Sequence, residues 1–330
     1  MTLKTRGSGR RTMDMGSTQN LDAPAHRAES TSGTANEIST LLQGFAVEVT
    51  ADEVLATEHI SALIPPGTQV YLPLLPNRTL AESVPAAERL AREGMIPVPH
   101  IAARRLATES ELSETLERMR EVAGVTSALV IAGDTNDVTG PYAGSLDLLE
   151  SGLLERAGIT NIGIAGYPEP HPLIAPPVIW ETLRRKCSIA ASSPAEFRIV
   201  SQFTFSSQSV IDWVDELRQN DVTLPVTVSV PGPAKLRTLL AYARRCGVST
   251  SFRQLTRNRK AILGLATVSA PDQVITGLAR HKGSSPDSTV AGVLFNVFGG
   301  LEETAGWIRA AQNGRIAMNR GGMGFTIERE

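Results

Sequence analysis

Apolar segments of strand length recur along this chain, and segments with helical periodicity separate them. We expect eight strands, which are Phe45–Thr50, Gln69–Leu75, Met95–Ile101, Ser127–Gly133, Asn161–Gly166, Phe197–Phe205, Val226–Val230 and Val290–Phe298. The helical patterns between them include Ser110–Val122, Pro177–Ala191, Ser209–Gln219, Ala234–Cys246 and Leu301–Asn313. Strands that alternate with amphipathic helices form parallel βαβ units, and eight such units close into a (β/α)8 barrel. The sequence therefore predicts an α/β protein with the TIM-barrel fold.

Two regions lie outside this alternation. Residues 1–36 are rich in Ser, Thr, Gly and Arg and hold little apolar surface to offset the entropy of ordering. We predict that they form a disordered tail and that residues 37–330 form one barrel domain. The connection before the last strand is unusually long and holds two more helical patterns, at Lys260–Thr267 and Pro271–Lys282. Connections of that length in a compact domain are commonly structured or functional.

Composition excludes several classes of protein. The formal net charge of the 330 residues is −2, which argues against nucleic-acid partners, because phosphate contacts require clustered Lys and Arg. No apolar run reaches the roughly 18 residues that span a bilayer, so we expect no membrane partner. The basic residues Lys4, Arg6, Arg10 and Arg11 precede no apolar segment of the kind found in secretory signals. We expect a cytoplasmic protein.

The sequence contains no metal or nucleotide signature. The two cysteines, Cys187 and Cys246, fall in expected helices, where small buried hydrophobes are the ordinary interpretation. The histidines show no metal-ligand spacing, so we expect no metal. A glycine-rich nucleotide loop and a GxSxG elbow are both absent, which argues against a Rossmann site and a serine hydrolase.

Polar residues lie at the ends of several expected strands, where barrel enzymes carry their active sites. Asp134 follows the fourth strand, and Gln202 lies near the end of the sixth. Tyr167, Glu169 and His171 alternate with prolines in the loop after the fifth strand. Prolines stiffen a loop and hold its side chains in fixed positions, as a binding site requires. We predict that these groups share one pocket.

The first and third strands add an acid and a histidine. Glu48 lies in an otherwise apolar strand, where burial would raise its pKa and let it hold a proton near neutral pH. His100 follows the rigid Pro97–Pro99 segment. Both lie toward the carboxyl ends of their strands, at the same end of the barrel as the residues above.

Four short motifs follow one another between about Phe45 and Trp307. They are Gly133-Asp134 with Tyr142-Ala143 shortly after, Tyr167–Pro172, Arg185-Lys186, and Gln202–Phe205 with its Gln-Phe-x-Phe pattern. Their order and spacing resemble the methylenetetrahydrofolate reductase family, of which this chain looks like a divergent member. The Tyr-Pro-Glu-Pro-His-Pro hexapeptide is the most specific element.

The resemblance implies a reaction and a set of site residues. NADH or NADPH would pass a hydride through bound FAD to 5,10-methylenetetrahydrofolate, giving 5-methyltetrahydrofolate for methionine biosynthesis. Glu48 would be the general acid at N10, and Asp134 would be a second catalytic residue that lies near flavin and folate and tunes their charge. Gln202, with Phe205, would bind the pterin, whose amide edge suits a side chain that both donates and accepts. The implied flavin contacts are His100, Asp134, Tyr142, Ala143, Tyr167, His171, Arg185 and Lys186. The family also implies association into homo-oligomers.

Two departures from the family keep other functions open. Ala132 stands where the family has an arginine, and Ile179 stands where it has an aspartate seven residues before Lys186. A flavin-free enzyme with direct hydride transfer, or one that runs oxidatively in one-carbon catabolism, would tolerate both changes. A noncatalytic barrel that binds folate or flavin and regulates a partner is a further alternative. Another is a different barrel enzyme, such as an aldolase or a pterin-dependent methyltransferase. None of the expected strands ends on the lysine that an aldolase would require.

Overall fold

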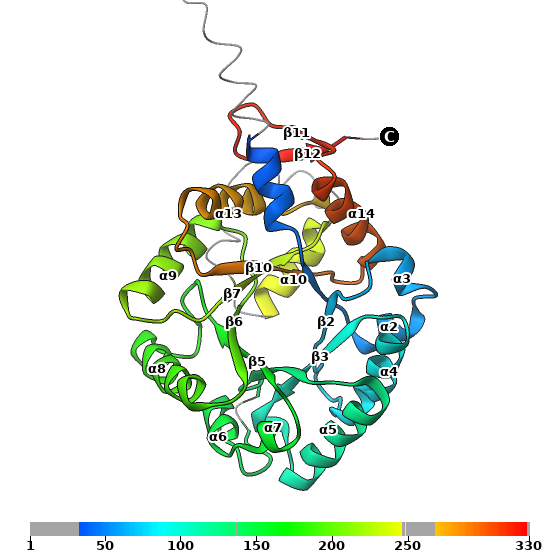
Figure 1. Ribbon diagram of the computed structural model, residues 1–330, viewed down its shortest axis with the longest axis vertical. Helices are drawn as coiled ribbons and strands as arrows, with labels where there is room; N and C mark the ends of the chain where they lie inside the picture. Colours follow the sequence, from blue (N-terminus) through cyan, green and yellow to red (C-terminus); the bar gives the residue numbers. More distant parts are fainter. Residues whose placement is uncertain (1–32, 136, 246–247, 249–267, 329–330) are drawn as a thin grey trace, which may run out of the picture.

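Eight parallel strands close into a barrel with helices around it (Figure 1). The computed structural model describes residues 33–328 except residue 136, residues 246–247 and residues 249–267. The barrel strands are β1 (Ala46–Glu48), β2 (Gln69–Leu72), β3 (Ile96–Ala102), β4 (Ser127–Ile131), β5 (Asn161–Gly166), β6 (Glu196–Ser201), β7 (Val226–Pro231) and β10 (Val290–Asn296). Their order around the barrel is β1-β10-β7-β6-β5-β4-β3-β2. The predicted (β/α)8 fold is confirmed.

The outer layer contains a helix after each barrel strand or a pair of short ones. These helices are α2 (Ala51–Ala56), α3 (Ile60–Leu63), α4 (Val84–Arg92), α5 (Glu109–Ala123), α6 (Ser145–Glu150), α7 (Leu153–Arg156), α8 (Pro176–Ser192), α9 (Ser207–Gln219), α13 (Asp272–Ser284) and α14 (Leu301–Gln312). Two 3-10 turns, Ala81–Ser83 and Ala103–Arg105, join them. The predicted pattern Lys260–Thr267 lies outside the described residues.

Hydroxyl side chains begin several of these helices directly after strands or loops. Thr50 accepts a hydrogen bond from the Glu53 amide at 3.2 Å, and Thr108 accepts one from the Glu111 amide at 3.1 Å. α5 then ends at Gly124, whose φ of 60° is the left-handed conformation that glycine adopts at low cost. Thr50 lies two residues after Glu48, so the cap of α2 fixes the chain just beyond the end of β1.

Side chains alternate between the barrel interior and the helical layer, as strand geometry requires. Inside the barrel, one apolar cluster contains Ala46, Tyr71, Val98, Leu129, Val200 and Leu294, from six different strands. Glu48 and His100 come two residues after Ala46 and Val98 and therefore continue the inward series toward the carboxyl ends of β1 and β3. Polar groups thus replace the apolar cluster at that end.

Helix α10 (Leu236–Arg245) is an extra helix, because α13 packs beside α9 and takes the outer position after β7. Its buried residues Leu236, Leu239 and Ala243 form a separate cluster with Phe205 and Phe298, which follow β6 and β10. Figure 1 shows α10 inside the ring of outer helices. α10 therefore lies against the carboxyl ends of these strands. Directly before it, β8 (Ala234–Lys235) pairs with β9 (Val268–Ser269) in a two-stranded antiparallel sheet.

The two ends of the described chain lie together. A first helix, residues 33–41, donates a hydrogen bond from the Ser39 hydroxyl to the Gln312 carbonyl at 2.7 Å. Residues 33–36, predicted as the end of a disordered tail, belong to this helix because Ile38, two residues on, anchors it in the core; residues 1–32 lie outside the described part. A terminal hairpin, β11 (Ile316–Met318) and β12 (Phe325–Ile327), packs Phe325 on Trp307 with ring centroids 5.2 Å apart. No helix among the described residues is long and apolar enough to cross a membrane.

Candidate functional site

Glu48 lies at the carboxyl end of β1, between Tyr71 on β2 and Asn296 on β10. Burial raises the pKa of Glu48 to about 7, although a hydrogen bond from Asn296 opposes the rise. Asn296 is oriented for this bond because its carbonyl oxygen accepts from the Ser229 hydroxyl at 2.6 Å, which leaves the amide NH2 to donate. The raised pKa expected from the sequence is therefore present in the structure.

His100 faces the same carboxyl group from β3. Its Nε2 lies 3.6 Å from Oε2 of Glu48, and only 7% of the residue is exposed. Burial lowers the pKa of His100 to about 3, so the imidazole is neutral at physiological pH. The edge of one ring meets the face of the other between His100 and Tyr71, with centroids 6.0 Å apart. The site thus places a carboxyl group, whose side chain is 22% exposed, beside a buried, neutral imidazole.

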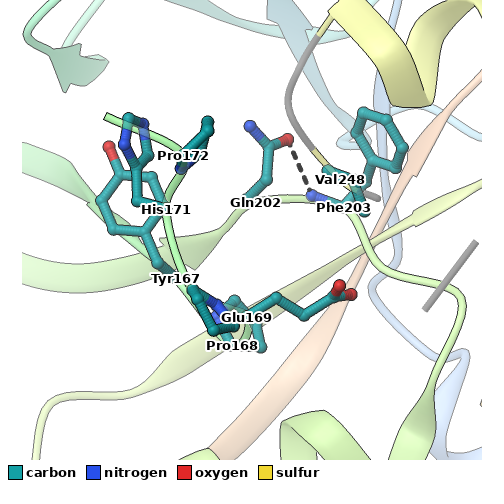
Figure 2. A pocket seen from close by; sticks show the side chains of 9 residues that line it. Tyr167, Pro168, Glu169, His171, Pro172, Gln202, Phe203 and Val248 are labelled. Atoms are coloured by element: carbon teal, nitrogen blue, oxygen red, sulfur yellow. Dashed lines mark hydrogen bonds between the residues drawn. The ribbon is translucent and has the colours of Figure 1, made fainter. Parts of the chain in front are cut away.

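The proline-rich loop after β5 forms one wall of a pocket (Figure 2). The Tyr167 and His171 rings meet edge to face at 4.9 Å. Nδ1 of His171 accepts hydrogen bonds from the amides of Leu173 and Ile174, both at 3.1 Å, so the proton of the neutral ring lies on Nε2. Burial lowers the pKa of His171, which favours this neutral form.

Glu169 ties this loop to the loop after β6. Its carboxylate accepts a hydrogen bond from the Thr204 hydroxyl at 2.8 Å. Thr204 is fully buried, and its oxygen also accepts from the Ser206 amide at 3.1 Å. The two loops are therefore held at a fixed separation. The pocket between them has an empty volume of about 290 Å³, including space open to solvent.

Gln202 enters this pocket from the opposite side (Figure 2). β6 ends at Ser201, one residue earlier, so Gln202 to Phe205 lie in the following loop. The Gln202 carbonyl oxygen accepts from the Phe203 amide at 3.0 Å, which leaves its NH2 group to donate to a ligand. Phe203 lines the pocket, whereas Phe205 packs against Phe203 and the α10 cluster.

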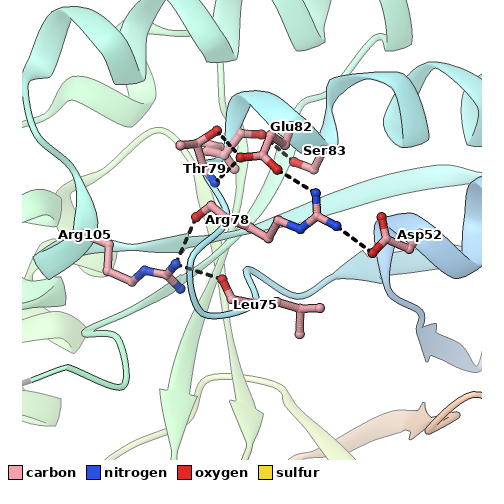
Figure 3. A network of polar contacts seen from close by, with 8 residues as sticks. Asp52, Leu75, Arg78, Thr79, Glu82, Ser83 and Arg105 are labelled. Atoms are coloured by element: carbon pink, nitrogen blue, oxygen red, sulfur yellow. Dashed lines mark hydrogen bonds and ion pairs between the residues drawn. The ribbon is translucent and has the colours of Figure 1, made fainter.

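Asp134, predicted as catalytic and as part of the shared pocket, is not among the residues that line it, and its side chain is 60% exposed. Its carboxylate oxygen is 3.9 Å from Arg105. Arg105 donates hydrogen bonds to the carbonyls of Leu75 at 2.8 Å and Arg78 at 2.9 Å, and Arg78 pairs in turn with Asp52 (Figure 3). Arg105 therefore fixes the loop after β2 and places a positive charge near Asp134.

Arg104 fixes the loop after β4 in the same way. It donates to the Ala143 carbonyl at 2.7 Å and to the Thr135 carbonyl at 3.1 Å, and its charge acts on the Tyr167 hydroxyl. Sequence reasoning did not select Arg104 or Arg105. Two adjacent arginines shortly after an expected strand are a signal that could have indicated them.

Tyr142 and Ala143 are not brought together with the other predicted flavin contacts. The Tyr142 ring is buried in the outer core, and its hydroxyl donates to Glu109 at the start of α5 at 2.8 Å. Ala143 contributes its carbonyl to Arg104. The hydrogen bond to Glu109 thus directs the Tyr142 hydroxyl toward α5.

Arg185 and Lys186 point to different surroundings, because adjacent helical residues lie on different faces. Arg185 is exposed and forms an ion pair with Glu150. Lys186 is 5% exposed, and burial lowers its pKa to about 8. Among the described residues, no hydrogen bond or ion pair of its ammonium group is found.

The described chain offers no group of three or more His, Cys, Asp or Glu residues that would hold a metal ion. The Gly299-Gly300 turn begins α14, whose first amide, on Leu301, donates to the Glu53 carboxylate at 3.3 Å. That carboxylate occupies the helix N-terminus where a phosphate would bind. Cys187 is partly buried in α8, and Cys246 lies outside the described residues.

Comparisons with known proteins show the fold. No protein-family model matches this chain. A Clostridium thermocellum protein that binds two copies of 5-methyl-5,6,7,8-tetrahydrofolic acid has a TM-score of 0.54 at 11% identity, over 84% of this chain and 96% of that one. A sugar phosphate isomerase/epimerase from Parabacteroides distasonis has a TM-score of 0.39 at 10% identity, over 80% of this chain and 96% of that one. The first likeness shows a shared (β/α)8 barrel, and the chemistry has to be argued from the site.

Proposed function

We propose that this chain is an oxidoreductase of the methylenetetrahydrofolate reductase type, which interconverts 5,10-methylenetetrahydrofolate and 5-methyltetrahydrofolate with NADH or NADPH. The observation that carries the proposal is the buried Glu48 carboxyl group, whose pKa is about 7. A carboxyl group with this pKa exists in both protonation states near neutral pH, so it donates a proton and recovers one in each turnover.

The reaction requires such a proton donor. In 5,10-methylenetetrahydrofolate, the methylene carbon bridges N5 and N10. When Glu48 protonates N10, the bond from carbon to N10 breaks and leaves an iminium group at N5. A hydride then converts that carbon into the methyl group of the product, and Glu48 regains its proton from solvent. Gln202 supports binding of the substrate, since its free NH2 group faces the pocket and donates to a pterin carbonyl.

Folate as the ligand class has support beyond the site. The Clostridium thermocellum barrel of similar architecture binds 5-methyltetrahydrofolate, the expected product here. The pocket between the loops after β5 and β6 combines the rings of Tyr167, His171 and Phe203 with the Gln202 amide. These groups suit a flat heteroaromatic ring that carries donors and acceptors.

Some of the predicted residues fit FAD. The buried Lys186 ammonium group is a positive charge that a phosphate would neutralise, and Tyr167 and His171 would contact the flavin through their rings. When bound, FAD would relay hydride from nicotinamide to folate. Arg104, close to Tyr167, would add positive charge at the same side of the barrel mouth.

Other predicted flavin contacts are engaged elsewhere, and this favours a second candidate. Glu150 holds Arg185, Glu109 holds the Tyr142 hydroxyl, and Ile179 replaces the family's aspartate. A protein without these contacts would transfer hydride directly from nicotinamide to folate. The roles of Glu48 and Gln202 are the same in both candidates.

An anaerobic reaction of the purified protein tests the proposal. We expect 5-methyltetrahydrofolate to form from 5,10-methylenetetrahydrofolate and NADH or NADPH. Flavin absorption bands that bleach on addition of the nucleotide would support the FAD-dependent form, and a colourless protein that forms product would support direct transfer. Folate binding without product under either nucleotide would leave a noncatalytic folate barrel and refute the reductase.

A further inference from the structure

The His100 imidazole carries a buried nitrogen with no hydrogen-bond partner in the described chain. This atom is Nε2, which lies 3.6 Å from Oε2 of Glu48. A buried polar atom that has lost its water and gained no partner destabilises the folded protein, so its retention calls for an explanation. The Glu48 oxygen is a polar atom just beyond hydrogen-bond length from this nitrogen.

The other groups around Glu48 do not accept the proton of its carboxyl group, which leaves Nε2 of His100 as the acceptor. Asn296 on β10 donates to Glu48, and its own carbonyl oxygen is taken by Ser229 on β7. Tyr71 on β2 is the next titratable group; burial raises its pKa, and the charge of Glu48 raises it further, so the phenol stays neutral. Arg198 on β6 acts on Tyr71 and opposes that rise. No cation is found against the carboxyl group among these residues.

We propose that His100 is a positioning residue for Glu48, with its unprotonated Nε2 accepting the hydrogen bond from the protonated carboxyl group at Oε2. A movement of about 0.5 Å brings the two atoms from their present separation to hydrogen-bond length. The purpose of this pairing rests on the proposed function. His100 would hold the proton on Glu48 until N10 of the folate replaces the imidazole as its acceptor. The pairing forms one hydrogen bond and changes no covalent bond in the protein without substrate.

The physical reason is that a neutral acceptor stabilises the protonated carboxyl group. A hydrogen bond to the neutral form of an acid disfavours ionisation. A protonated imidazole at the same place would do the opposite, because its positive charge would stabilise the carboxylate. The burial that keeps His100 neutral is therefore what makes it a partner for a proton donor.

Titration of Glu48 by NMR tests this pairing without any substrate. Protein with 13C-labelled glutamate carboxyl groups is titrated, and Glu48→Gln identifies the signal. We expect His100→Phe, which keeps a ring against Tyr71, to lower the proton affinity of Glu48 about tenfold, or about one pKa unit. His100→Gln, whose carbonyl oxygen accepts a hydrogen bond, should restore the wild-type value. His281→Phe on α13 is the matched control, because its Nε2 is also buried without a partner in the described chain.

Two results would overturn the proposal. One is an unchanged Glu48 titration in folded His100→Phe. The other comes from the wild-type protein and needs no variant to fold: a long-range 1H–15N spectrum that shows a proton on Nε2 of His100 at pH 5.5, where Glu48 is mostly protonated and His100 is neutral. Because neither experiment involves turnover, absence of reductase activity would refute the proposed function and leave the pairing standing. Normal turnover with an unaffected Glu48 titration would refute the pairing alone.

Discussion

Glu48 and His100 change the free energy of unfolding in opposite directions as pH varies. Burial raises the pKa of Glu48 from 4.5 to about 7, so the folded protein binds more protons than the unfolded chain and stability falls as pH rises through this interval. Burial lowers the pKa of His100 from 6.5 to about 3, so the folded protein binds fewer protons and stability rises with pH there. Between pH 4.5 and 6.5 the two slopes oppose each other.

Glu48→Gln removes the Glu48 contribution to the pH dependence of the free energy of unfolding and leaves that of His100. One proton of difference changes the free energy of unfolding by about 1.4 kcal/mol per pH unit. Across the overlap of the two intervals, we therefore expect Glu48→Gln to gain about 2 kcal/mol relative to the wild type as pH rises. His100→Phe should show the opposite sign, losing stability relative to the wild type over the same range.

Urea unfolding at several pH values between 4.5 and 7.5 measures these differences. Glu181→Gln is a suitable control, because its side chain is 67% exposed on α8. If the free energies of Glu48→Gln and the wild type ran parallel across the range, Glu48 would not titrate as a buried group. The argument for its role as a proton donor would then fail.

Three further substitutions test the pocket. Gln202→Ala should raise the KM for folate about tenfold through the loss of one hydrogen bond, while Gln208→Ala on the exposed face of α9 leaves it unchanged; equal values would remove Gln202 from the site. Lys186→Met should raise the free energy of unfolding at pH 7 by up to about 3 kcal/mol, because a buried cation disappears, and should weaken FAD binding in a fluorescence titration. A loss of stability would contradict its burial as an unpaired charge. Thr204→Val should cost about 1 kcal/mol in thermal unfolding and weaken folate binding, because it releases Glu169, whereas Thr204→Ser keeps both; identical behaviour of the two variants would show that the hydroxyl bond does not hold the loops.

The barrel and much of its mouth were predictable from the sequence because they depend on local patterns. Each expected strand overlaps an observed strand, since apolar runs between amphipathic helices have few other solutions. Glu48 was identified because it is an acid in an otherwise apolar strand, and the structure places it two residues after the inward-facing Ala46. The Tyr167 loop, Gln202 and Asp134 were expected in one pocket; the structure places the loop and Gln202 there, whereas Asp134 does not line it.

Contacts between distant loops were beyond sequence reasoning. Arg104 and Arg105 bind backbone carbonyls of other loops, and a carbonyl leaves no trace in a side-chain pattern. The direction of Tyr142 depends on Glu109, 33 residues earlier, and the C-terminal hairpin depends on the stacking of Phe325 on Trp307. The 3.6 Å approach of His100 to Glu48 arises from the closure of the barrel, which brings β1 and β3 together across β2.

The most direct test of Glu48 as the proton donor separates folate binding from folate reduction in one variant. Glu48→Gln is compared with the wild type for binding of 5-methyltetrahydrofolate by calorimetry and for formation of that compound from 5,10-methylenetetrahydrofolate with NADH or NADPH. We predict that the variant binds with an affinity within a few-fold of the wild type, because glutamine has the same size, and forms product at least about a hundredfold more slowly, as expected for the loss of a general acid. Wild-type rates of product formation in Glu48→Gln would contradict the assignment of the proton donor and with it the central claim for this site.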